Sequence, residues 1–457
     1  MSEPHALSEQ TDAGTRGSAT ARSAAIRRHF KAGGLANDTA WGSAHDVSQM
    51  LLQIITFLVL SRKLGVTRYG QYAGIYGIVG PLNGLTWSAT MLAVLQRRLR
   101  DEVPTERTSR DFFGFTLVLV SVGAVVGALL GRVWIDNVAF VAIAAIMIAE
   151  MIGIGLINVG AAMVQANQGF AYAARLRMVI LAIRLTVLLS LASIDHLTLV
   201  TLGIGYAIGF LAYTAVMVVH ILPGRGIPVL WGRPDKAVFH TSALLAVPLG
   251  TGVLQQDGDK VVLNAQGFQH DAGVYAAAFR VVGMGLMPLR ALESAAFQRF
   301  LPHNDSERNQ HVRRAARYSV LALGISVLLG LGIMLARPLL PWVLGHAFDE
   351  SERIVPWLLP FLPLTAVSNA PSNGLLGLGR LGVRLGIYAT GALVSVTTYI
   401  VAIPRFDDHW KGAVLGTIVG ESFLAIAGWI ALLHFQGRHN RELDERIQTE
   451  STPSLTA

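Results

Sequence analysis

The feature that most constrains this chain is a succession of apolar runs, each about twenty residues long. A hydrocarbon core about 30 Å thick takes roughly twenty helical residues to cross, and a spanning segment can satisfy its own backbone hydrogen bonds only as a helix or in a closed barrel. About twelve such runs can be distinguished in the sequence. They cover residues 44–64, 72–95, 112–133, 138–163, 178–194, 197–222, 239–263, 274–301, 318–344, 355–378, 385–403 and 413–435.

Composition supports the same conclusion. Only 14% of the 457 residues are charged and 52% are hydrophobic, which leaves too few charges to cover the surface of a soluble protein of this size. All the segments between the runs are short, so neither side of the membrane has room for a soluble catalytic domain. The sequence therefore predicts an all-α polytopic membrane protein with about twelve transmembrane helices that is not an enzyme.

The basic residues predict the orientation of the chain. The net charge of +8 comes from arginines in short clusters between apolar runs, which is the positive-inside pattern and not a nucleic-acid-binding face. The intervening loops on the other side contain fewer Lys and Arg residues. An even number of spans places both ends on one side, so we expect both termini in the cytoplasm and no nucleic-acid partner. The cytoplasmic clusters are 97–100, 175–177, 225–236, 308–317 and 438–446.

A short motif indicates two related halves. Gly70-Gln71-Tyr72-Ala73 is echoed by Gly273-Val274-Tyr275-Ala276, and each copy follows the first span of its half. The Gly- and Pro-containing segment 223–238 lies between the sixth and seventh runs and reads as a linker. Six spans on each side of it give both halves the same orientation, as parallel repeats require. The predicted units are a polar and basic tail (1–40), a six-helix bundle (41–222), a linker (223–238), a second six-helix bundle (239–436) and a tail (437–457).

Charged residues inside the runs are the candidate functional residues. A charge at the centre of a spanning helix costs about 2.5–3.5 kcal/mol on the insertion scale, so its presence needs a reason. Residues 254–289 contain Asp257, Asp259, Lys260 and Arg280 in otherwise apolar sequence. Arg280 and Asp257 each lie seven or eight residues from the turn between two spans, on the order of 10 Å deep, and are expected to pair across that hairpin. Either the pair only fixes helix register, or the charges line a polar cavity that receives an anionic head group.

The remaining intramembrane charges are assigned by sign. The expected substrate-binding cations are Arg280, Lys260, Arg184 and Arg290. The expected ion-coupling groups or charge partners are Asp257, Asp259, Glu150, Glu421 and Asp46.

Several motifs are absent. The chain has no phosphate-binding Gly-x-x-x-x-Gly-Lys-Ser/Thr loop, no His-Glu-x-x-His pair and no cysteine. The adjacent residues Asp407, Asp408 and His409 cannot surround an ion and read as a solvated loop. We therefore expect no nucleotide, metal or other cofactor.

Five segments carry a resemblance to a known family. They are 56–73 (TFLVLSRKLGVTRYGQYA), Asp259-Lys260, 273–280 with its Gly-Val-Tyr and Ala-Phe-Arg, 377–380 (GLGR) and 412–416 (GAVLG). In order and spacing they resemble the polysaccharide transporter family, the O-antigen, teichoic acid and exopolysaccharide flippases of the multidrug/oligosaccharidyl-lipid/polysaccharide (MOP) superfamily. The chain departs from that family in having several Ala- and Val-rich spans with few aromatic residues.

The resemblance implies a MATE-like arrangement of two six-helix bundles around a central cavity that opens alternately to each side. The implied substrate is an undecaprenyl-pyrophosphate-linked oligosaccharide, turned over in a bacterial plasma (inner) membrane. Na⁺ or H⁺ is the implied coupling ion, and glycan polymerases and glycosyltransferases are the implied partners. One alternative is a cation-coupled MATE-like drug antiporter, which favours acidic and aromatic residues in the cavity. The other is a membrane glycan polymerase or ligase, which needs a large outer loop that the sequence lacks.

Overall fold

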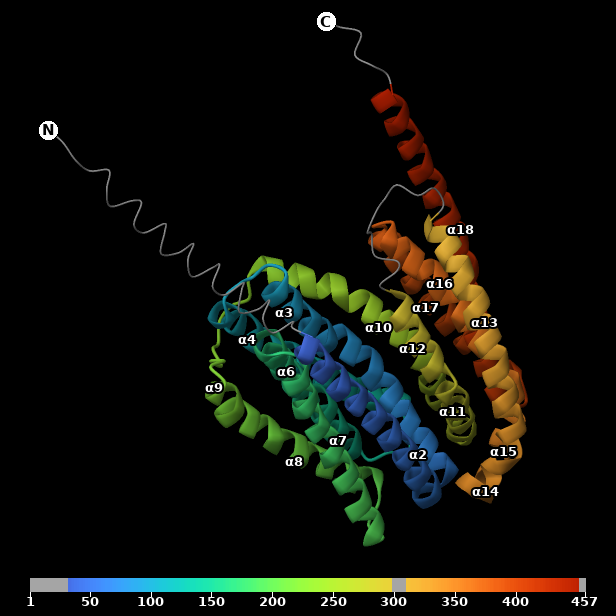
Figure 1. Ribbon diagram of the computed structural model, residues 1–457. Coiled ribbons are helices and arrows are strands. Elements are labelled where there is room, and N and C mark those ends of the chain that lie inside the picture. The colour runs from blue at the N-terminus through green and yellow to red at the C-terminus, as the bar shows by residue number, and fades with distance from the viewer. Residues whose placement is uncertain (1–31, 298–309, 452–457) are drawn as a thin grey trace, which may run out of the picture.

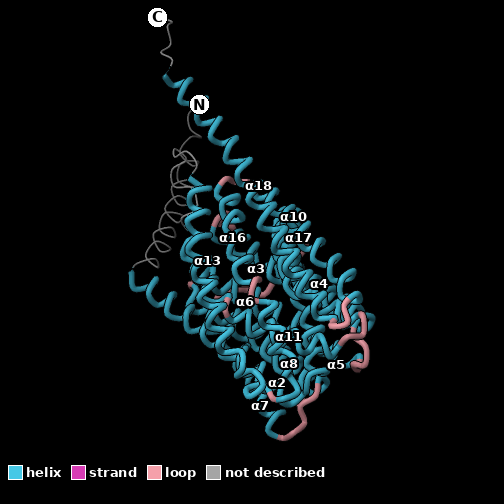
Figure 2. Tube along the Cα trace, turned by 90° about the vertical axis from the view of Figure 1, so that its right-hand side faces the viewer, coloured by secondary structure: helices cyan, strands magenta, loops and turns pink. Residues whose placement is uncertain are grey.

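The computed structural model describes residues 32–297 and 310–451, which form helices and short connections and no strand (Figures 1 and 2). Long helices lie side by side, and most of the turns lie at the two ends of the bundle. The predicted all-α membrane architecture is therefore confirmed. Residues 1–31 of the predicted N-terminal tail, the end of the 274–301 span and the start of the 308–317 basic loop lie outside the described residues.

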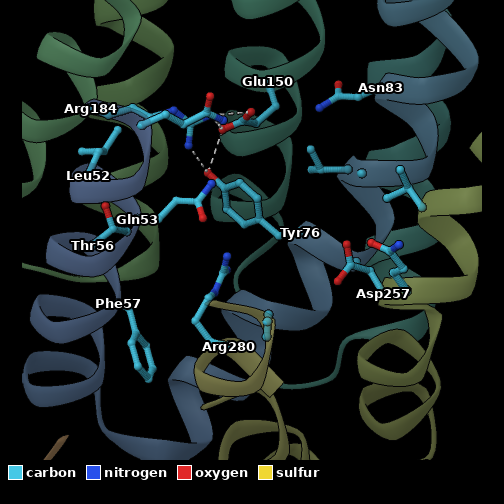
Figure 3. Close-up of a pocket in the computed structure, with 18 of the residues that line it drawn as sticks. Leu52, Gln53, Thr56, Phe57, Tyr76, Asn83, Glu150, Arg184, Asp257 and Arg280 are labelled. Atoms are coloured by element: carbon cyan, nitrogen blue, oxygen red, sulfur yellow. Dashed lines mark hydrogen bonds and ion pairs between the residues drawn. The ribbon is translucent and has the colours of Figure 1, made fainter. Parts of the chain in front are cut away.

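The first helix, α2 (Ala32–Asn83), contains two arms separated at Gly65. Gly65 has φ 75° and ψ 172°, a conformation that glycine adopts at little cost, and the chain turns back there. Figure 3 shows the two arms as adjacent stretches of helix, one carrying Leu52 and the other Tyr76. The end of the molecule at the Gly65 bend is called the hairpin end, and the opposite end, to which the last part of α18 extends in Figure 1, is called the termini end.

The second arm of α2 continues through a π-helical turn, η1 (Gly84–Ser88), into α3 (Ala89–Leu99). The rest of the N-terminal group consists of α4 (Thr105–Trp134), α5 (Phe140–Met147), η2 (Ile148–Gly153), α6 (Ile154–Gln168), α7 (Phe170–Ser193), α8 (Leu199–Val216), η3 (Met217–Ile221) and α9 (Leu222–Gly224).

The C-terminal group begins with α10, which packs on α2 and α3 on one side and on α17 and α18 on the other. The last helix continues well past the bundle (Figure 1). The helices are α10 (Lys236–Ala265), α11 (Gln269–Met284), α12 (Leu286–Phe297), α13 (Gln310–Ala336), η5 (Arg337–Leu339), α14 (Leu340–Leu344), η6 (His346–Phe348), α15 (Asp349–Leu358), α16 (Phe361–Gly377), α17 (Leu381–Ala402), η7 (Ile403–Arg405) and α18 (His409–Ser451).

Nine helices in the described part of the chain are long and apolar enough to cross a membrane, or ten if a pair bent by 45° counts as one span. Three features separate these nine from the predicted twelve. The predicted tenth span, 355–378, falls in the bent pair. The first candidate, Ala40–Leu99, holds two predicted spans because it turns back at Gly65. The predicted eighth span is interrupted at Gly285 into α11 and α12, and neither piece has the length to cross alone.

A row of glycines brings α2 against α10 and α11. Gly70, Gly77 and Gly84 repeat every seven residues on one face of the second arm and its continuation. A Cβ atom on Gly77 would lie 2.8 Å from the Asp257 carbonyl oxygen, and one on Gly70 would lie 2.7 Å from the Gly273 backbone nitrogen. Small residues allow membrane helices to approach this closely. The two Gly-x-Tyr-Ala motifs therefore meet each other at the hairpin end.

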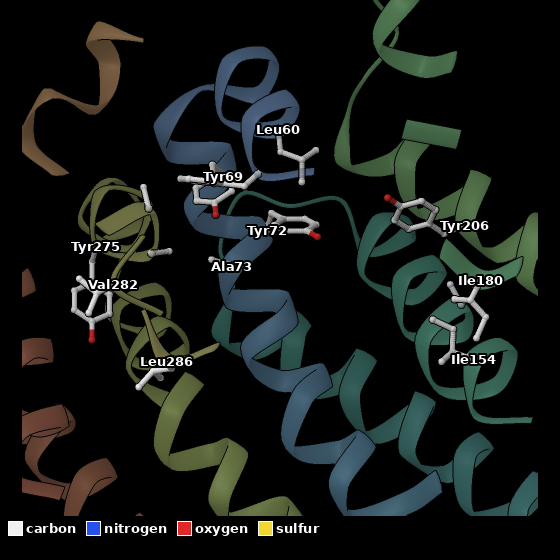
Figure 4. Close-up of a cluster of buried hydrophobic side chains, with 14 of the residues drawn as sticks. Leu60, Tyr69, Tyr72, Ala73, Ile154, Ile180, Tyr206, Tyr275, Val282 and Leu286 are labelled. Atoms are coloured by element: carbon white, nitrogen blue, oxygen red, sulfur yellow. The ribbon is translucent and has the colours of Figure 1, made fainter. Parts of the chain in front are cut away.

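The hydrophobic core joins both groups of helices. In Figure 4 the second arm of α2, with Tyr69 and Tyr72, lies between the helices that carry Ile154 and Tyr206 and the helix that carries Tyr275. These residues belong to one hydrophobic cluster, and the side chain of each is buried. The second arm of α2 is thus the element on which both groups of helices pack.

Candidate functional site

A cavity of about 830 Å³ lies between the two groups of helices. Both arms of α2 form much of its wall, and α3, η2, α6, α7, α10, α11 and α12 supply the rest. Its polar lining contains five cationic side chains from Lys and Arg and two carboxylates. The charged and amide residues are His45, Gln49, Gln53, Asn83, Glu150, Asn158, Arg177, Arg184, Gln256, Asp257, Lys260, Arg280 and Arg290.

One carboxylate, Glu150, is committed to Arg184. The Nη2 atom of Arg184 on α7 lies 2.6 Å from Glu150 Oε1 and 2.7 Å from Oε2, and the Tyr76 hydroxyl donates a hydrogen bond of 2.7 Å to Oε1 (Figure 3). The guanidinium also stands over the rings of Tyr206 and Phe210 at 5.6 Å. Arg184, predicted as a second substrate-binding cation, is therefore neutralised within the wall of the cavity.

The second carboxylate, Asp257, pairs with Lys260. The ammonium of Lys260 lies 3.0 Å from Asp257 Oδ1 and 2.9 Å from Asp259 Oδ1. Asp259 is fully buried and also accepts a hydrogen bond of 2.6 Å from the Tyr275 hydroxyl. The predicted pairing of Asp257 with Arg280 is wrong. Lys260 lies three residues after Asp257 on the same helix, so their side chains meet directly, and the Lys260 ammonium pairs with the carboxylates of both Asp257 and Asp259.

Arg280 lies in the cavity and forms no ion pair with any described residue. Its side chain is exposed to the cavity and points from α11 into the space between Gln53 and Tyr76 (Figure 3). Its electrostatic neighbours are the hydroxyls of Tyr69 and Tyr72 and the carboxylate of Asp257. Arg280 and Arg290, both predicted to bind substrate, thus line the cavity without a carboxylate partner among the described residues, whereas Lys260 is paired.

Arg290 and Asp46 occupy different surroundings. Arg290 lies on α12, about three turns beyond Arg280, and lines the termini end of the cavity with Arg177. Asp46 is exposed and does not line the cavity, although its neighbour His45 does. The structure therefore does not bring Asp46 to the other candidate residues.

Contacts between the two groups close the hairpin end. The Nε atom of Arg62 donates a hydrogen bond of 2.9 Å to the Val343 carbonyl, and the rings of Tyr69 and Phe348 meet edge to face at 5.9 Å. At the termini end, Arg97 of α3 lies 3.6 Å from Asp235, the N-cap residue of α10, whereas the lining residues Arg177 and Arg290 stand on opposite walls of the cavity. The Arg62 hydrogen bond and the Tyr69–Phe348 ring contact thus close the cavity at the hairpin end.

Sequence analysis did not single out the neutral polar wall formed by α2. Tyr69, Tyr72 and Tyr76 follow one face of the second arm, with the Tyr72 and Tyr76 ring centroids 4.5 Å apart, and Gln49 and Gln53 lie on the first arm. The sequence contained a signal for this wall, since the three tyrosines follow the Gly65 bend at spacings of three and four residues, which place them on one helix face. Aromatic rings therefore gather at the cavity although they are few in the sequence.

A second cavity of about 390 Å³ lies inside the C-terminal group. It shares Gln256, Leu286 and Arg290 with the first cavity, so the two adjoin. The buried carboxylate of Glu421 lines it and accepts hydrogen bonds from Ser368 at 2.9 Å and Gln255 at 3.4 Å. Glu421, predicted to be an ion-coupling residue, thus lies in a different cavity from Arg280, while Arg290 lines both cavities.

A chain of hydrogen bonds connects the two buried carboxylates of this group. The Tyr275 hydroxyl joins Asp259 to Thr417, at 2.6 and 3.1 Å, and the Tyr399 hydroxyl joins Thr417 to the Gln255 carbonyl, at 3.2 and 3.0 Å. The Gln255 side chain then reaches Glu421. These bonds tie α10, α11, α17 and α18 together. Within the described residues, no three His, Cys, Asp or Glu side chains are grouped as a metal site.

Comparison with solved structures identifies the fold. An inward-facing multidrug resistance MATE transporter of the MOP superfamily superimposes with a TM-score of 0.70 at 14% identity, over 86% of this chain and 96% of that one. The chain has a MATE-like fold. An outward-facing transporter of the same description superimposes with a TM-score of 0.60 at 14% identity, over 88% of this chain and 96% of that one. A MATE in the bent conformation superimposes with a TM-score of 0.58 at 14% identity, over 89% of this chain and 97% of that one. No protein-family model and no curated protein sequence matches the chain.

Proposed function

We propose that this protein is a transporter that works by alternating access and moves an undecaprenyl-pyrophosphate-linked oligosaccharide across the plasma membrane. The observation that carries the proposal is the charge of the cavity. Five cationic side chains face two carboxylates there, and both carboxylates are already bound to a cation. The surplus positive charge, above all that of Arg280, suits an anionic head group.

The chemistry of the head group agrees with this charge. A diphosphate cannot cross hydrocarbon unaided, because transferring an ion into a low-dielectric medium is very costly. The planar guanidinium of Arg280 can donate two parallel hydrogen bonds to phosphate oxygens. The amides of Gln49, Gln53 and Asn83 present donors and acceptors suited to sugar hydroxyls. The lipid tail would remain in the membrane while the cavity shields the polar part.

Orientation follows from the same proposal. With both termini in the cytoplasm, the termini end of the cavity faces the cytoplasm, where lipid-linked precursors are made. The overlap with the inward-facing MATE transporter, 0.70 against 0.60 for the outward-facing one, fits closure at the hairpin end.

A cation-coupled drug antiporter is the second candidate, favoured by the MATE-like fold and by the tyrosines on α2. A cationic drug would need a free carboxylate in the cavity. Glu150 and Asp257 are instead paired with Arg184 and Lys260, and Arg280 would repel the drug. Efflux of a cationic dye from cells that express the chain, abolished by Glu150→Gln, would favour the antiporter.

The second cavity supports the choice of a coupling ion. The Glu421 carboxylate accepts hydrogen bonds from the Ser368 hydroxyl and the Gln255 amide nitrogen, and the Thr365 hydroxyl lines the same cavity. Hard oxygen ligands suit Na⁺, and a buried carboxylate suits H⁺. We therefore place ion coupling at Glu421, to be tested by transport with and without Na⁺ and across a pH range in Glu421→Gln.

Replacement of Arg280 tests the main proposal. In a strain lacking the gene, Arg280→Ala should abolish restoration of surface glycan, and Arg280→Lys should restore it partly because it keeps the charge but loses the two-pronged geometry. Arg175→Ala, outside the cavity, is the control for loss of one arginine. Full restoration by Arg280→Ala at a normal expression level would contradict the proposal.

A further inference from the structure

The cations of the cavity occupy different depths. On the C-terminal wall, Arg280 lies eleven residues after the start of α11 at the hairpin end, and Arg290 follows ten residues later, about 15 Å further along the helix. On the N-terminal wall, Arg177 lies only seven residues after the start of α7, and Asp38 caps that start at the termini end through the Ala171 nitrogen at 2.8 Å. Arg177 and Arg290 thus stand near the termini end, and Arg280 stands deep.

The two cations that line the cavity at the termini end have no carboxylate partner among the described residues. Arg177 donates to the Gln165 side-chain oxygen at 3.3 Å and contacts the Met91 sulfur at 3.4 Å, and its buried Nε atom has no hydrogen-bond partner. His45 lies near it and has a buried Nδ1 atom without a partner. Arg290, on the opposite wall, forms no ion pair with any described residue. Unsatisfied donors in a partly buried place are costly unless a ligand or water completes them.

We infer that Arg177 and Arg290, with His45, form a second anion site that takes the diphosphate of a lipid before it reaches Arg280. This inference rests on the proposed function, transport of a lipid diphosphate, and adds a first binding site to the transport pathway. A lipid held in one leaflet presents its phosphates near the membrane surface, at the level of the termini end and not at the depth of Arg280. The intervening wall of Gln49, Gln53 and Asn83 carries no net charge and lies along the route between the two sites.

The position of the two arginines gives the site a role in closure. Arg177 belongs to the N-terminal group and Arg290 to the C-terminal group, so closing the termini end brings two like charges together. Repulsion opposes that movement while the site is empty, and a diphosphate between the guanidiniums removes it. Binding would therefore favour closure, which ties the conformational change to the presence of substrate.

Binding kinetics of a simple lipid diphosphate test the inference. The wild-type protein in nanodiscs is mixed with geranylgeranyl diphosphate, and binding is followed through tryptophan fluorescence, since Trp87 lines the cavity. Geranylgeraniol, which lacks phosphate, and inorganic diphosphate, which lacks the lipid, are the comparison ligands. The variants are Arg177→Gln, Arg290→Gln and Arg280→Gln.

A matched control exists on the same helix. Arg175 lies two residues before Arg177 but is exposed, and it stacks on the rings of Trp41 and Tyr172 at 4.3 and 5.3 Å. Arg175→Gln therefore removes the same charge at the same level without touching the cavity. We expect Arg177→Gln and Arg290→Gln each to slow association and to weaken affinity about tenfold, the loss of one charge-assisted hydrogen bond. Arg175→Gln should have no such effect, and Arg280→Gln should leave association unchanged while speeding dissociation.

The outcomes separate the inference from the proposed function. If the two variants at the termini end associate as fast as wild type while Arg280→Gln loses binding, the diphosphate goes directly to Arg280. The second site is then refuted and the proposed function stands. If wild type binds geranylgeraniol as tightly as the diphosphate, neither arginine site reads phosphate and both ideas fail.

Discussion

Replacing Glu150 by glutamine should destabilise the protein by leaving Arg184 without its counter-ion. The Glu150 side chain is 3% exposed and that of Arg184 is 20% exposed, so the pair lies in the wall of the cavity. Removing one partner of a buried pair costs about 3–5 kcal/mol. Because cavity water can still solvate part of the guanidinium, we expect the lower end of that range, about 3 kcal/mol. The Tyr76 hydroxyl would still have a side-chain oxygen to donate to.

The assay is thermal unfolding of purified protein, followed by intrinsic tryptophan fluorescence. A change of 1 kcal/mol moves the melting temperature of a 150–250-residue domain by about 2–4 °C, and a longer chain by less, so we expect a fall of about 3–6 °C. The double variant Glu150→Gln/Arg184→Met should recover most of this loss, because replacing both members of a buried pair is often nearly neutral. Glu150→Gln should also bind anionic lipids more tightly, since it frees the Arg184 charge.

The chain offers an exposed pair as a control. Lys63 and Asp195 lie 2.5 Å apart with side chains 45% and 80% exposed, and the Lys63 ammonium lowers the pKa of the Asp195 carboxyl. Water solvates both groups whether or not they pair, so Asp195→Asn should leave the melting temperature nearly unchanged. Equal melting temperatures for Glu150→Gln and wild type, or a double variant no more stable than the single one, would refute the reasoning.

Four further predictions concern the fold and its orientation in the membrane. Tyr275→Phe removes the hydroxyl that donates to Asp259 and should lower stability by about 1–3 kcal/mol, measured by thermal unfolding; an unchanged melting temperature would count against the buried chain. Gly273→Val should force the halves apart, because the new side chain would meet the Val66 backbone of α2, and should reduce transport at normal expression. In an experimental structure the halves should superimpose with Gly70 on Gly273. A reporter that is active only in the periplasm should be inactive when it is fused after Arg438. Activity of that fusion would contradict the predicted cytoplasmic C-terminus.

Much of the architecture could be predicted from the sequence. Twenty-residue apolar runs leave the backbone no alternative to a helix in a membrane, so the all-α class follows from run length alone. The depth of Arg280 was readable because helical rise is constant, and the structure places it in the cavity. The pairing of Asp257 with Lys260 was also readable from their spacing of three residues, although the prediction chose a partner across the turn instead.

The tertiary structure decided which charges remain available. Nothing in the spacing of Glu150 and Arg184, on different helices, tells whether they face each other, because that depends on how each helix is rotated about its axis. The rotation is set by packing, which here turns Glu150 of η2 and Arg184 of α7 toward each other. The same packing turned three tyrosines of α2 toward the cavity and left Glu421 in a separate one. Sequence determines what a helix carries, and only contact between helices determines what each side chain meets.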